Sequence, residues 1–373
     1  MRVGLIIYGR LDTLSGGYLY DRKLVETLQR HGDEVQILSL KPSSYGRHLT
    51  HNFDNTLFNH LRDANYDLLL QDELNHPSLF WINQQLRPLV PYPIISVVHH
   101  LRSDERHSPW LMPFYHTIEK RYLASVDAFI ANSRTTRISV ENLLPQQRPT
   151  MVAYPGGNHL RPDISQHAIV ARAQKPGPLR ILFVGNLIRR KGLHTLLAAL
   201  DYLPARSWRL DIVGDPDVEP AYVRRAIVPA LHRLNQAQIT RHGVVSNWAL
   251  SALYAKSHVL VMPSEYEGFG IVYLEAMGFG LPVIGSTAGA ASEIIKHGKN
   301  GYRLPPKNVV SLAKHLFLLN EDRRLLLRLG LAAQKRFQAH PTWDESMDSV
   351  RDFMLEVASQ NHALQQQTNK PTN

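Results

Sequence analysis

The chain has 373 residues and is 44% hydrophobic and 20% charged, so it has the length of two domains and enough apolar side chains for sizeable cores. It contains no cysteine, which excludes disulfides and cysteine-ligated zinc and makes a reducing cytoplasm the expected compartment. The net charge of +10 favours an anionic partner: nucleic acid, a phosphorylated substrate or an acidic membrane.

The first half of the sequence alternates short apolar runs with helix-like segments. The first run, residues 3–9, is too short for the core of a signal peptide, so we expect a buried first strand. No apolar stretch reaches the roughly 18 residues of a membrane span. Because apolar strands separated by helical segments form parallel sheets covered on both faces, we expect a doubly wound domain over residues 1–160. Its further strands are expected at 35–40, 67–71, 94–98 and 127–133.

Two features of this first domain suit a ligand. Gly16 and Gly17 are expected between the first strand and the first helix, where backbone N–H groups could meet a phosphate or a sugar, although the spacing is not that of a nicotinamide site. His99 and His100 directly follow the strand at 94–98. Ligands gather at the carboxyl ends of parallel strands, and a histidine there could hydrogen-bond a sugar hydroxyl or simply end the strand.

Two segments of the first domain mix aromatic, apolar and basic side chains. They are residues 76–93 and 102–121. Together with the net charge, they raise the hypothesis of peripheral association with an anionic membrane. The same aromatic residues could instead belong to the core or line a cleft for a soluble substrate.

A polar segment with proline near both ends, residues 161–178, is expected to be a linker. A second set of strands then predicts another doubly wound domain over 179–340. A C-terminal helix over 341–360 is expected to pack back on the first domain, followed by a frayed tail over 361–373. The second set of strands is expected at 179–185, 209–215, 259–264 and 281–286.

A basic loop follows the first strand of the second domain. Arg189, Arg190 and Lys191 precede Gly192, where a helix starts. Cations beside a helix N-terminus can clamp a phosphate, although the spacing is not that of a Walker A loop and a basic surface turn would look similar. Asp215 and Asp217 form an Asp-x-Asp pair in a later loop, a position that does not favour a metal-nucleotide site.

The most specific pattern is the segment PSEYEGFGIVYLEAMGFGLPVIGS at 263–286. A strand ends at Ser264, a loop carries Glu267, and a helix is expected from about Ile271. The glycines of the loop let backbone approach a ligand, and the first N–H groups of the helix attract a phosphate or pyrophosphate. Glu275 lies just over one turn inside the helix, where its carboxylate could accept hydrogen bonds from a ribose diol.

These blocks resemble the fourth glycosyltransferase family, the group 1 glycosyl transferases, whose members are retaining GT-B enzymes. The glutamate block at 263–286 and the lysine–glycine pair after the basic loop match most closely, and YPGGN at 154–158 also fits. The resemblance spans most of residues 1–350. It implies two Rossmann-like domains facing a central cleft. It also implies a hexosyltransferase of class EC 2.4 that acts in polysaccharide or glycolipid biosynthesis.

The resemblance implies a nucleotide-diphosphate sugar as donor and an acceptor hydroxyl on a glycan, a lipid-linked or a small molecule, with no metal, no other cofactor and no nucleic acid. Asn186 departs from the family pattern, which often has arginine there, so Arg189 or Arg190 could supply the charge. The resemblance implies that Lys191 binds the donor pyrophosphate and Glu275 the ribose. Glu267, with the backbone of Phe269, Gly270 and Ile271, would hold the transferred sugar and phosphate. His99 would contact the sugar, and Gly16 and Gly17 would close over it.

Two other function classes remain open. A basic nucleic-acid-binding protein would explain the charge, although no helix-turn-helix, KH or RRM signature is present. A GT-B epimerase or phosphorylase would share the fold, and a phosphorylase would need a pyridoxal lysine motif that the sequence lacks. If the chain is instead a glycosyltransferase of the fourth family, charged groups and a helix end are expected to stabilise the leaving nucleotide, and domain closure is expected to exclude water.

Overall fold

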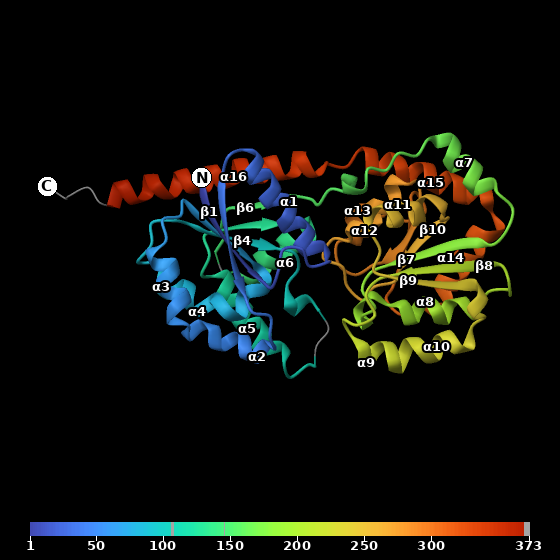
Figure 1. The fold of residues 1–373 in the computed structure, drawn as a ribbon, viewed down its shortest axis with the longest axis horizontal. Coiled ribbons are helices and arrows are strands. Elements are labelled where there is room, and N and C mark those ends of the chain that lie inside the picture. The colour runs from blue at the N-terminus through green and yellow to red at the C-terminus, as the bar shows by residue number, and fades with distance from the viewer. Residues whose placement is uncertain (106–107, 145, 369–373) are drawn as a thin grey trace. The chain divides into compact units, whose positions relative to one another are not determined.

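The structure is a computed structural model that describes residues 1–105, 108–144 and 146–368. The chain divides into two compact units, each with a six-stranded sheet (Figure 1). Unit 1 comprises Met1–Pro155 and Trp343–Asn373, and unit 2 comprises Gly156–Thr342. The chain therefore leaves unit 1 after Pro155 and returns to it at Trp343.

The sheet of unit 1 has the order β2-β1-β3-β4-β5-β6, and all neighbouring strands are parallel. Its central strands β3 and β4 are buried along their whole length, as expected where helices cover both faces. The carboxyl ends of the strands share one edge, which is where ligands bind in open parallel sheets. The strands are β1 (Arg2–Tyr8), β2 (Glu34–Leu40), β3 (Leu68–Asp72), β4 (Ile94–Val98), β5 (Ala128–Ala131) and β6 (Thr150–Val152).

The core of unit 1 joins the sheet to the helices of one face. Leu79 and Ile82 of α4 and Tyr122 of α5 pack in one apolar cluster with Ile94 and Phe129 of the sheet. Figure 1 shows these helices and α3 on one side of the sheet, and α1 and α16 on the other. The helices are α1 (Gly16–Arg30), α2 (Tyr45–His48), α3 (Asn55–Asp63), α4 (His76–Leu86), α5 (Met112–Leu123), α6 (Arg134–Leu143) and α16 (Trp343–Thr368), with 3₁₀ turns at Leu49–Phe53, Glu73–Asn75 and Arg102–Asp104.

The last helix, α16, belongs to unit 1. The ring of Trp343 lies 5.8 Å from that of Tyr20 in α1, and the guanidinium of Arg351 pairs with the buried carboxylate of Asp33 at 2.6 Å. The helix continues to Thr368, so the part of the expected tail at 361–368 is helical. Residues 369–373 lie outside the described part of the chain.

The sheet of unit 2 has the order β12-β11-β10-β7-β8-β9, again with parallel neighbours. The helices α9 and α10 are joined by a π-helical turn at Val223–Ile227. The strands are β7 (Leu179–Val184), β8 (Trp208–Val213), β9 (Ile239–Gly243), β10 (Val259–Met262), β11 (Val283–Ser286) and β12 (Gly301–Leu304); the helices are α7 (Gln166–Gln174), α8 (Leu193–Leu200), α9 (Pro220–Tyr222), α10 (Val228–Arg233), α11 (Asn247–Lys256), α12 (Ile271–Gly278), α13 (Ala291–Ile294), α14 (Val309–Glu321) and α15 (Arg323–Gln338).

The segment 161–178, expected to be an open linker, contains helix α7 and is part of unit 2. Ser165 caps this helix by accepting a hydrogen bond from the N–H of Ala168, and Ile169 is buried. The guanidinium of Arg172 donates to the carbonyl oxygens of Phe279 and Gly280 at 2.9 and 2.8 Å. The polar composition of the segment therefore reflects the solvent side of a packed helix, and the expectation of a linker is wrong for these residues.

Candidate functional site

Two loops of unit 2 leave neighbouring strands at their carboxyl ends. The strands β7 and β10 pair directly, so the loops 185–192 and 263–270 start at the same edge of the sheet. The N–H of Glu265 donates to the carbonyl of Arg190 at 2.7 Å and joins the two loops. Gly192 has a φ of +74°, and a Cβ there would lie 2.2 Å from the carbonyl oxygen of Pro263, so only glycine fits this contact.

The two loops bring Lys191 and Glu267 together. The Lys191 Nζ lies 2.7 Å from the Glu267 Oε1, and the Glu267 side chain is only 6% exposed. The Arg190 guanidinium lies 3.9 Å from the same oxygen and donates to the carbonyl of Tyr266. Burial opposes ionisation of Glu267, but the charges of Lys191 and Arg190 outweigh it and hold its pKa below the ordinary value. Glu267 is therefore an ionised carboxylate at neutral pH.

Arg189 and Arg190, which precede Lys191, make different contacts. The N–H of Arg189 donates to the Glu219 carboxylate at 2.8 Å, and its guanidinium lies 5.5 Å from the centre of the Tyr222 ring. Arg190 instead turns toward the loop that carries Glu267. Of the two candidates to replace the arginine absent at Asn186, the structure brings only Arg190 to the Lys191–Glu267 pair.

Helix α12 begins at Ile271, as the sequence predicted. Its N-cap, Gly270, has a φ of +91°, and a Cβ there would lie 2.5 Å from the ring of Tyr273. Glycine is thus required for the tight turn that leads from the loop into the helix. Phe269 and Ile271 are buried on either side of this turn, so their side chains belong to the core and only their backbone groups are suited to a ligand.

Glu275 is held from two sides inside unit 2. The Tyr254 hydroxyl donates to its Oε2 at 2.7 Å, and the His159 Nε2 lies 3.3 Å from its Oε1. Glu275 and Tyr254 are both buried. Sequence reasoning missed Tyr254 and His159 as partners, because they come from α11 and from the 3₁₀ turn Asn158–Leu160, far from α12 along the chain.

In unit 1, the paired glycines lie inside the first helix instead of before it. Helix α1 starts at Gly16, and Ser15 caps it by accepting a hydrogen bond from the N–H of Tyr18. A Cβ at Gly17 would lie 3.1 Å from the His99 Cδ2. Gly17 therefore leaves room for the imidazole of His99, which follows β4 and is 8% exposed.

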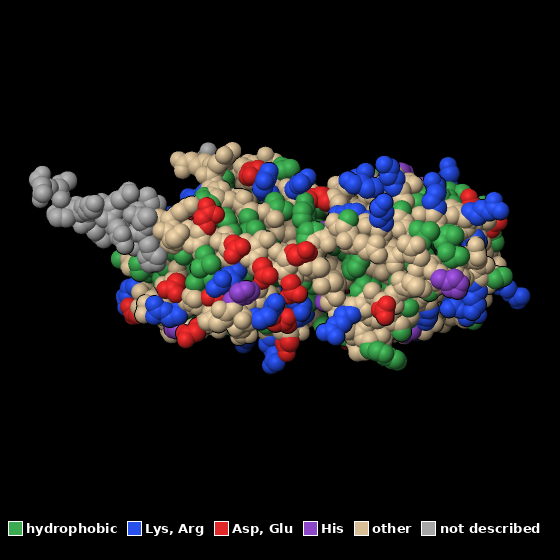
Figure 2. Space-filling model, turned by 90° about the horizontal axis from the view of Figure 1, so that it is seen from above, with side chains coloured by type: hydrophobic (Ala, Val, Ile, Leu, Met, Phe, Trp, Pro, Cys, Tyr) green, Lys and Arg blue, Asp and Glu red, His purple; other side chains and the backbone are tan. Residues whose placement is uncertain are grey.

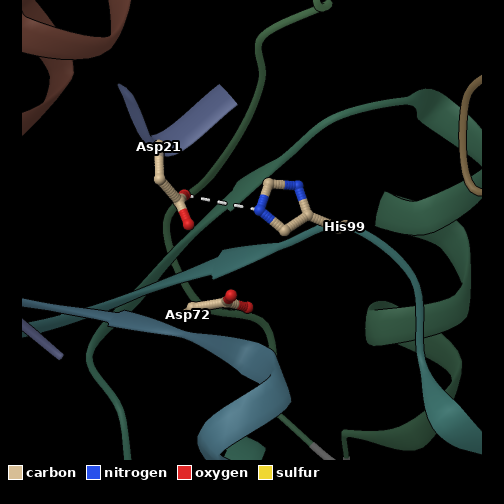
Figure 3. Close-up of side chains that lie close together, drawn as sticks. All are labelled: Asp21, Asp72 and His99. Atoms are coloured by element: carbon tan, nitrogen blue, oxygen red, sulfur yellow. Dashed lines mark ion pairs between the residues drawn. The ribbon is translucent and has the colours of Figure 1, made fainter. Parts of the chain in front are cut away.

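His99 lies beside two buried carboxylates that sequence reasoning missed. The His99 Nε2 is 3.4 Å from the Asp21 Oδ1, and Asp72 completes a group whose polar atoms lie within 4.8 Å of one another (Figure 3). A second buried group of this kind consists of Glu73, His76 and Glu119. The sequence did carry a signal for Asp72, which is the last residue of an apolar strand, but only a weak one for Asp21, which lies on the buried face of α1.

In unit 1, each of these two groups brings two carboxylates and one imidazole together. The Asp-x-Asp pair of unit 2 is different. The Asp215 carboxylate accepts a hydrogen bond from the N–H of Asp217 at 2.8 Å, which makes a local turn. Within the described residues, this pair is not part of a group of three metal-ligating side chains.

The segments proposed to contact a membrane are partly exposed. Trp110 is 76% exposed, and Trp81 and Phe114 are also exposed, whereas Tyr115 is buried. The guanidinium of Arg102 lies 4.7 Å from the centre of the Tyr115 ring, so this cation is packed on an aromatic face. Among the described residues, no helix is both long and apolar enough to span a membrane.

The positive charge of the chain is concentrated in unit 2. Residues 156–342 contain 24 of the 42 basic residues but only 12 of the 32 acidic ones. Unit 1 therefore has 18 basic and 20 acidic residues and is close to neutral. Figure 2 shows lysine and arginine side chains gathered over the unit 2 part of the surface, with few acidic side chains among them. Such a field favours an anionic ligand for unit 2.

Residues 166–336 match the family model described as glycosyl transferases group 1. This segment, a little under half of the chain, is thus similar to the group 1 glycosyl transferases. A glycogen synthase of Mycobacterium tuberculosis is 28% identical over 275 residues, which cover 72% of this chain and 63% of that protein. The chain thus spans less than two thirds of the length of this relative.

Solved structures show the same fold. A sucrose-phosphate synthase from Thermosynechococcus elongatus has a TM-score of 0.80 at 22% identity, covering 96% of this chain and 100% of that one. HepE from Anabaena, solved in complex with UDP and glucose, has a TM-score of 0.73 at 20% identity, covering 95% and 100%. Two doubly wound domains in this arrangement along the chain define the GT-B fold, and the expected fold class is confirmed.

Proposed function

We propose that the chain is a group 1 glycosyl transferase, a retaining, metal-independent enzyme of the fourth glycosyltransferase family. It transfers a hexose from a nucleotide-diphosphate sugar to an acceptor hydroxyl on a glycan, a lipid or a small molecule, in the cytoplasm. The observation that carries this proposal is the partly buried Lys191–Glu267 pair at the strand edge of the positively charged unit 2. HepE, which shares the fold, binds UDP and glucose, and this supports a nucleotide sugar as the partner.

The donor pyrophosphate would bind at Lys191 and Arg190. Both are less than one third exposed, which strengthens their attraction for a phosphate relative to surface cations. The N-terminus of helix α12, which begins at Ile271, adds positive potential at the same edge of the sheet. The ribose would bind at Glu275, whose carboxylate Tyr254 orients through its hydroxyl.

Glu267 would have two roles in this scheme. Its carboxylate holds Lys191 in place in the free protein and accepts hydrogen bonds from the hydroxyls of the transferred sugar when a donor is bound. The backbone of Phe269 and Gly270 would contact the same sugar and its phosphate. In unit 1, His99 would contact the sugar, and the first turn of α1 at Gly16 and Gly17 would close over the donor.

The chemistry follows from the distribution of charge. As the bond between the sugar and the phosphate breaks, negative charge grows on the leaving pyrophosphate, and Lys191, Arg190 and the α12 N-terminus would stabilise it. Losing one such group costs about 3 kcal/mol of barrier stabilisation. In unit 2, Glu267 is engaged with Lys191, and Glu275 with Tyr254 and His159. Two further carboxylates near this edge are also engaged, Glu265 with Lys307 and Glu219 with the N–H of Arg189. We therefore infer front-face attack, in which a leaving phosphate oxygen accepts the proton of the acceptor.

The experiment that tests this function is a donor-turnover panel. UDP-, GDP- and ADP-sugars are incubated with the protein, with and without glycan, glycolipid and small-molecule acceptors, and nucleotide release is measured. We expect one donor to be turned over faster with an acceptor than without it. Epimerisation of the donor without transfer would favour a GT-B epimerase. Tight binding of random oligonucleotides without any turnover would favour a nucleic-acid-binding protein.

A further inference from the structure

The imidazole of His99 is enclosed by the first turns of helix α1. Gly17 leaves the space that the ring fills, since a Cβ there would lie 3.1 Å from the His99 Cδ2. The Tyr20 ring meets it edge-on, with 5.3 Å between the ring centres. The Asn132 side-chain amide donates to the backbone carbonyl of His99 at 2.8 Å and so holds the main chain that carries the ring. The position of the ring is therefore fixed by packing, and Asp21 in the same helix meets its edge.

Asp21 has no hydrogen-bonding role in the described part of the fold. It is completely buried, and neither of its carboxylate oxygens accepts a hydrogen bond from the described residues. Its closest opposite charge is the His99 Nε2 at 3.4 Å, with the orientation seen in Figure 3. A buried carboxylate without compensation is strongly unfavourable. Asp21 therefore favours the form of His99 that carries a proton on Nε2.

The charged groups that act most strongly on His99 are all acidic. Asp21 faces the ring from α1, Asp72 from the end of β3 and Glu73 from the following 3₁₀ turn, with Glu119 of α5 behind Glu73. Burial alone would lower the pKa of His99, but the proximity and charge of Asp21, together with Asp72 and Glu73, outweigh it and raise that pKa to about 8. Burial and the charge of Asp21 also raise the pKa of Asp72. Protons bound to His99 and Asp72 can thus balance the negative charge of these carboxylates without a metal ion.

We propose that Asp21 is a positioning residue that binds the Nε2–H of His99 and keeps the ring an imidazolium, so that the Nδ1–H donates a hydrogen bond to the substrate. Figure 3 shows Nδ1 on the side of the ring away from Asp21 and Asp72. In this arrangement His99 stabilises negative charge or a sugar oxygen as a donor and does not act as a base. The identity of the substrate rests on the proposed function, whereas the protonation of His99 does not.

The first test is a titration of the histidine side chains by ¹⁵N NMR, with the His99 signals assigned by their absence in His99→Gln. We expect His99 in the wild-type protein to titrate near pH 8 and to show the imidazolium form at pH 7. In Asp21→Asn the midpoint should fall by more than one pH unit. Asp33→Asn, which removes another buried carboxylate of unit 1 that pairs with Arg351, should leave the His99 midpoint unchanged. If Asp21→Asn does not fold, the wild-type titration alone still decides the claim.

The second test is the pH dependence of turnover. The wild-type rate should stay constant up to about pH 8 and then fall, and in Asp21→Asn the fall should begin near pH 6.5. At pH 7, kcat should drop about 10- to 100-fold, as expected for a misplaced catalytic group, with the donor KM nearly unchanged. Asp33→Asn should keep the wild-type profile.

Two results would overturn the proposal. One is a wild-type His99 that titrates at or below the ordinary histidine value. The other is a His99 resonance that shifts or broadens with stoichiometric Mn²⁺ or Zn²⁺, since Asp21, Asp72 and His99 would then be a cation site. If His99 titrates as expected but no nucleotide sugar is turned over, the proposed function fails and the role of Asp21 stands. If turnover is normal but His99 is neutral at pH 7, the reverse holds.

Discussion

Lys191 and Glu267 form an ion pair of 2.7 Å in unit 2, although 76 residues separate them in the sequence. Lys191 comes from the loop after β7, and Glu267 from the loop after β10. The pair exists because the two strands are neighbours in the sheet and Gly192 lets the loops touch. A buried pair of this kind contributes little net stability, yet it costs a great deal to leave one partner without the other.

Lys191→Met should therefore affect both stability and binding. Loss of the cation leaves Glu267 buried without its partner, so the free energy of unfolding should fall by about 3 kcal/mol. Nucleotide affinity should fall about 10- to 100-fold, the value of one or two charge-assisted hydrogen bonds. Denaturant unfolding and calorimetry measure the two effects. The same change at the exposed Lys299 is the control and should alter neither.

The double variant Lys191→Met/Glu267→Gln separates the two effects. Removing the carboxylate charge should recover most of the lost stability, because no buried charge is left uncompensated. Nucleotide affinity should stay low, since the phosphate-binding cation is still absent. Recovery of affinity together with stability would show that Lys191 only supports the fold.

Glu275→Ala should weaken nucleotide binding while the chain remains folded. Its carboxylate accepts a hydrogen bond from Tyr254 and lies near His159, and a ribose diol would add hydrogen bonds to the same carboxylate. Isothermal calorimetry with the best nucleotide should show a loss of about tenfold or more. Tyr254→Phe, which keeps the carboxylate and removes one hydroxyl, should show a smaller loss. An unchanged affinity in Glu275→Ala would contradict the ribose assignment.

The fold class and the elements of the second domain could be predicted from the sequence because the patterns that indicate them are formed by consecutive residues. The strand at 259–264, the loop glycines and the helix from Ile271 follow one another directly, and the structure has them in that order. Apolar runs also revealed most strands. The exceptions are β6, β9 and β12, which lie at sheet edges and are short or polar, as in Thr150–Val152 and Ile239–Gly243.

The contacts of the site residues could not be predicted from the sequence in this way. Asp21, Asp72 and His99 come from three elements that only the parallel sheet and α1 bring together. Likewise, Arg189 and Arg190 are equivalent in the sequence, and only the positions of Glu219 and Tyr222 separate them. Helix α7 was missed because its buried face consists of few residues, among them Ile169.

Chelation should not stop the reaction, and the product should keep the anomeric configuration of the donor. The expected cause is that Lys191, Arg190 and the α12 N-terminus neutralise the leaving pyrophosphate without a metal. Turnover is measured with and without EDTA, and the anomer is identified by proton NMR before it equilibrates. Loss of activity that manganese restores would contradict the metal-independent mechanism, and an inverted product would contradict retention.

Membrane association would depend on the exposed aromatic residues of unit 1. Trp110 and Phe114 are exposed, but the positive charge of the chain lies in unit 2. If the acceptor is lipid-linked, flotation with vesicles of graded phosphatidylglycerol content should show binding that rises with anionic lipid and falls with salt. Trp110→Ala should reduce it, and Trp248→Ala, an exposed tryptophan of unit 2, is the control. Absence of binding at low salt, with good activity on a soluble sugar, would identify a soluble acceptor.

The measurement that tests the central claim most directly is a thermal-shift panel of UDP, GDP, ADP and their sugars on the wild-type protein, Lys191→Met and Glu275→Ala. A ligand that binds only the folded state at 100 times its Kd stabilises it by about 2.7 kcal/mol, which should raise the Tm by a few degrees. We expect one base to raise the wild-type Tm clearly more than the others, and both variants to lose that increase. No shift with any nucleotide, or an equal shift in all three proteins, would contradict a donor site built on Lys191, Glu267 and Glu275.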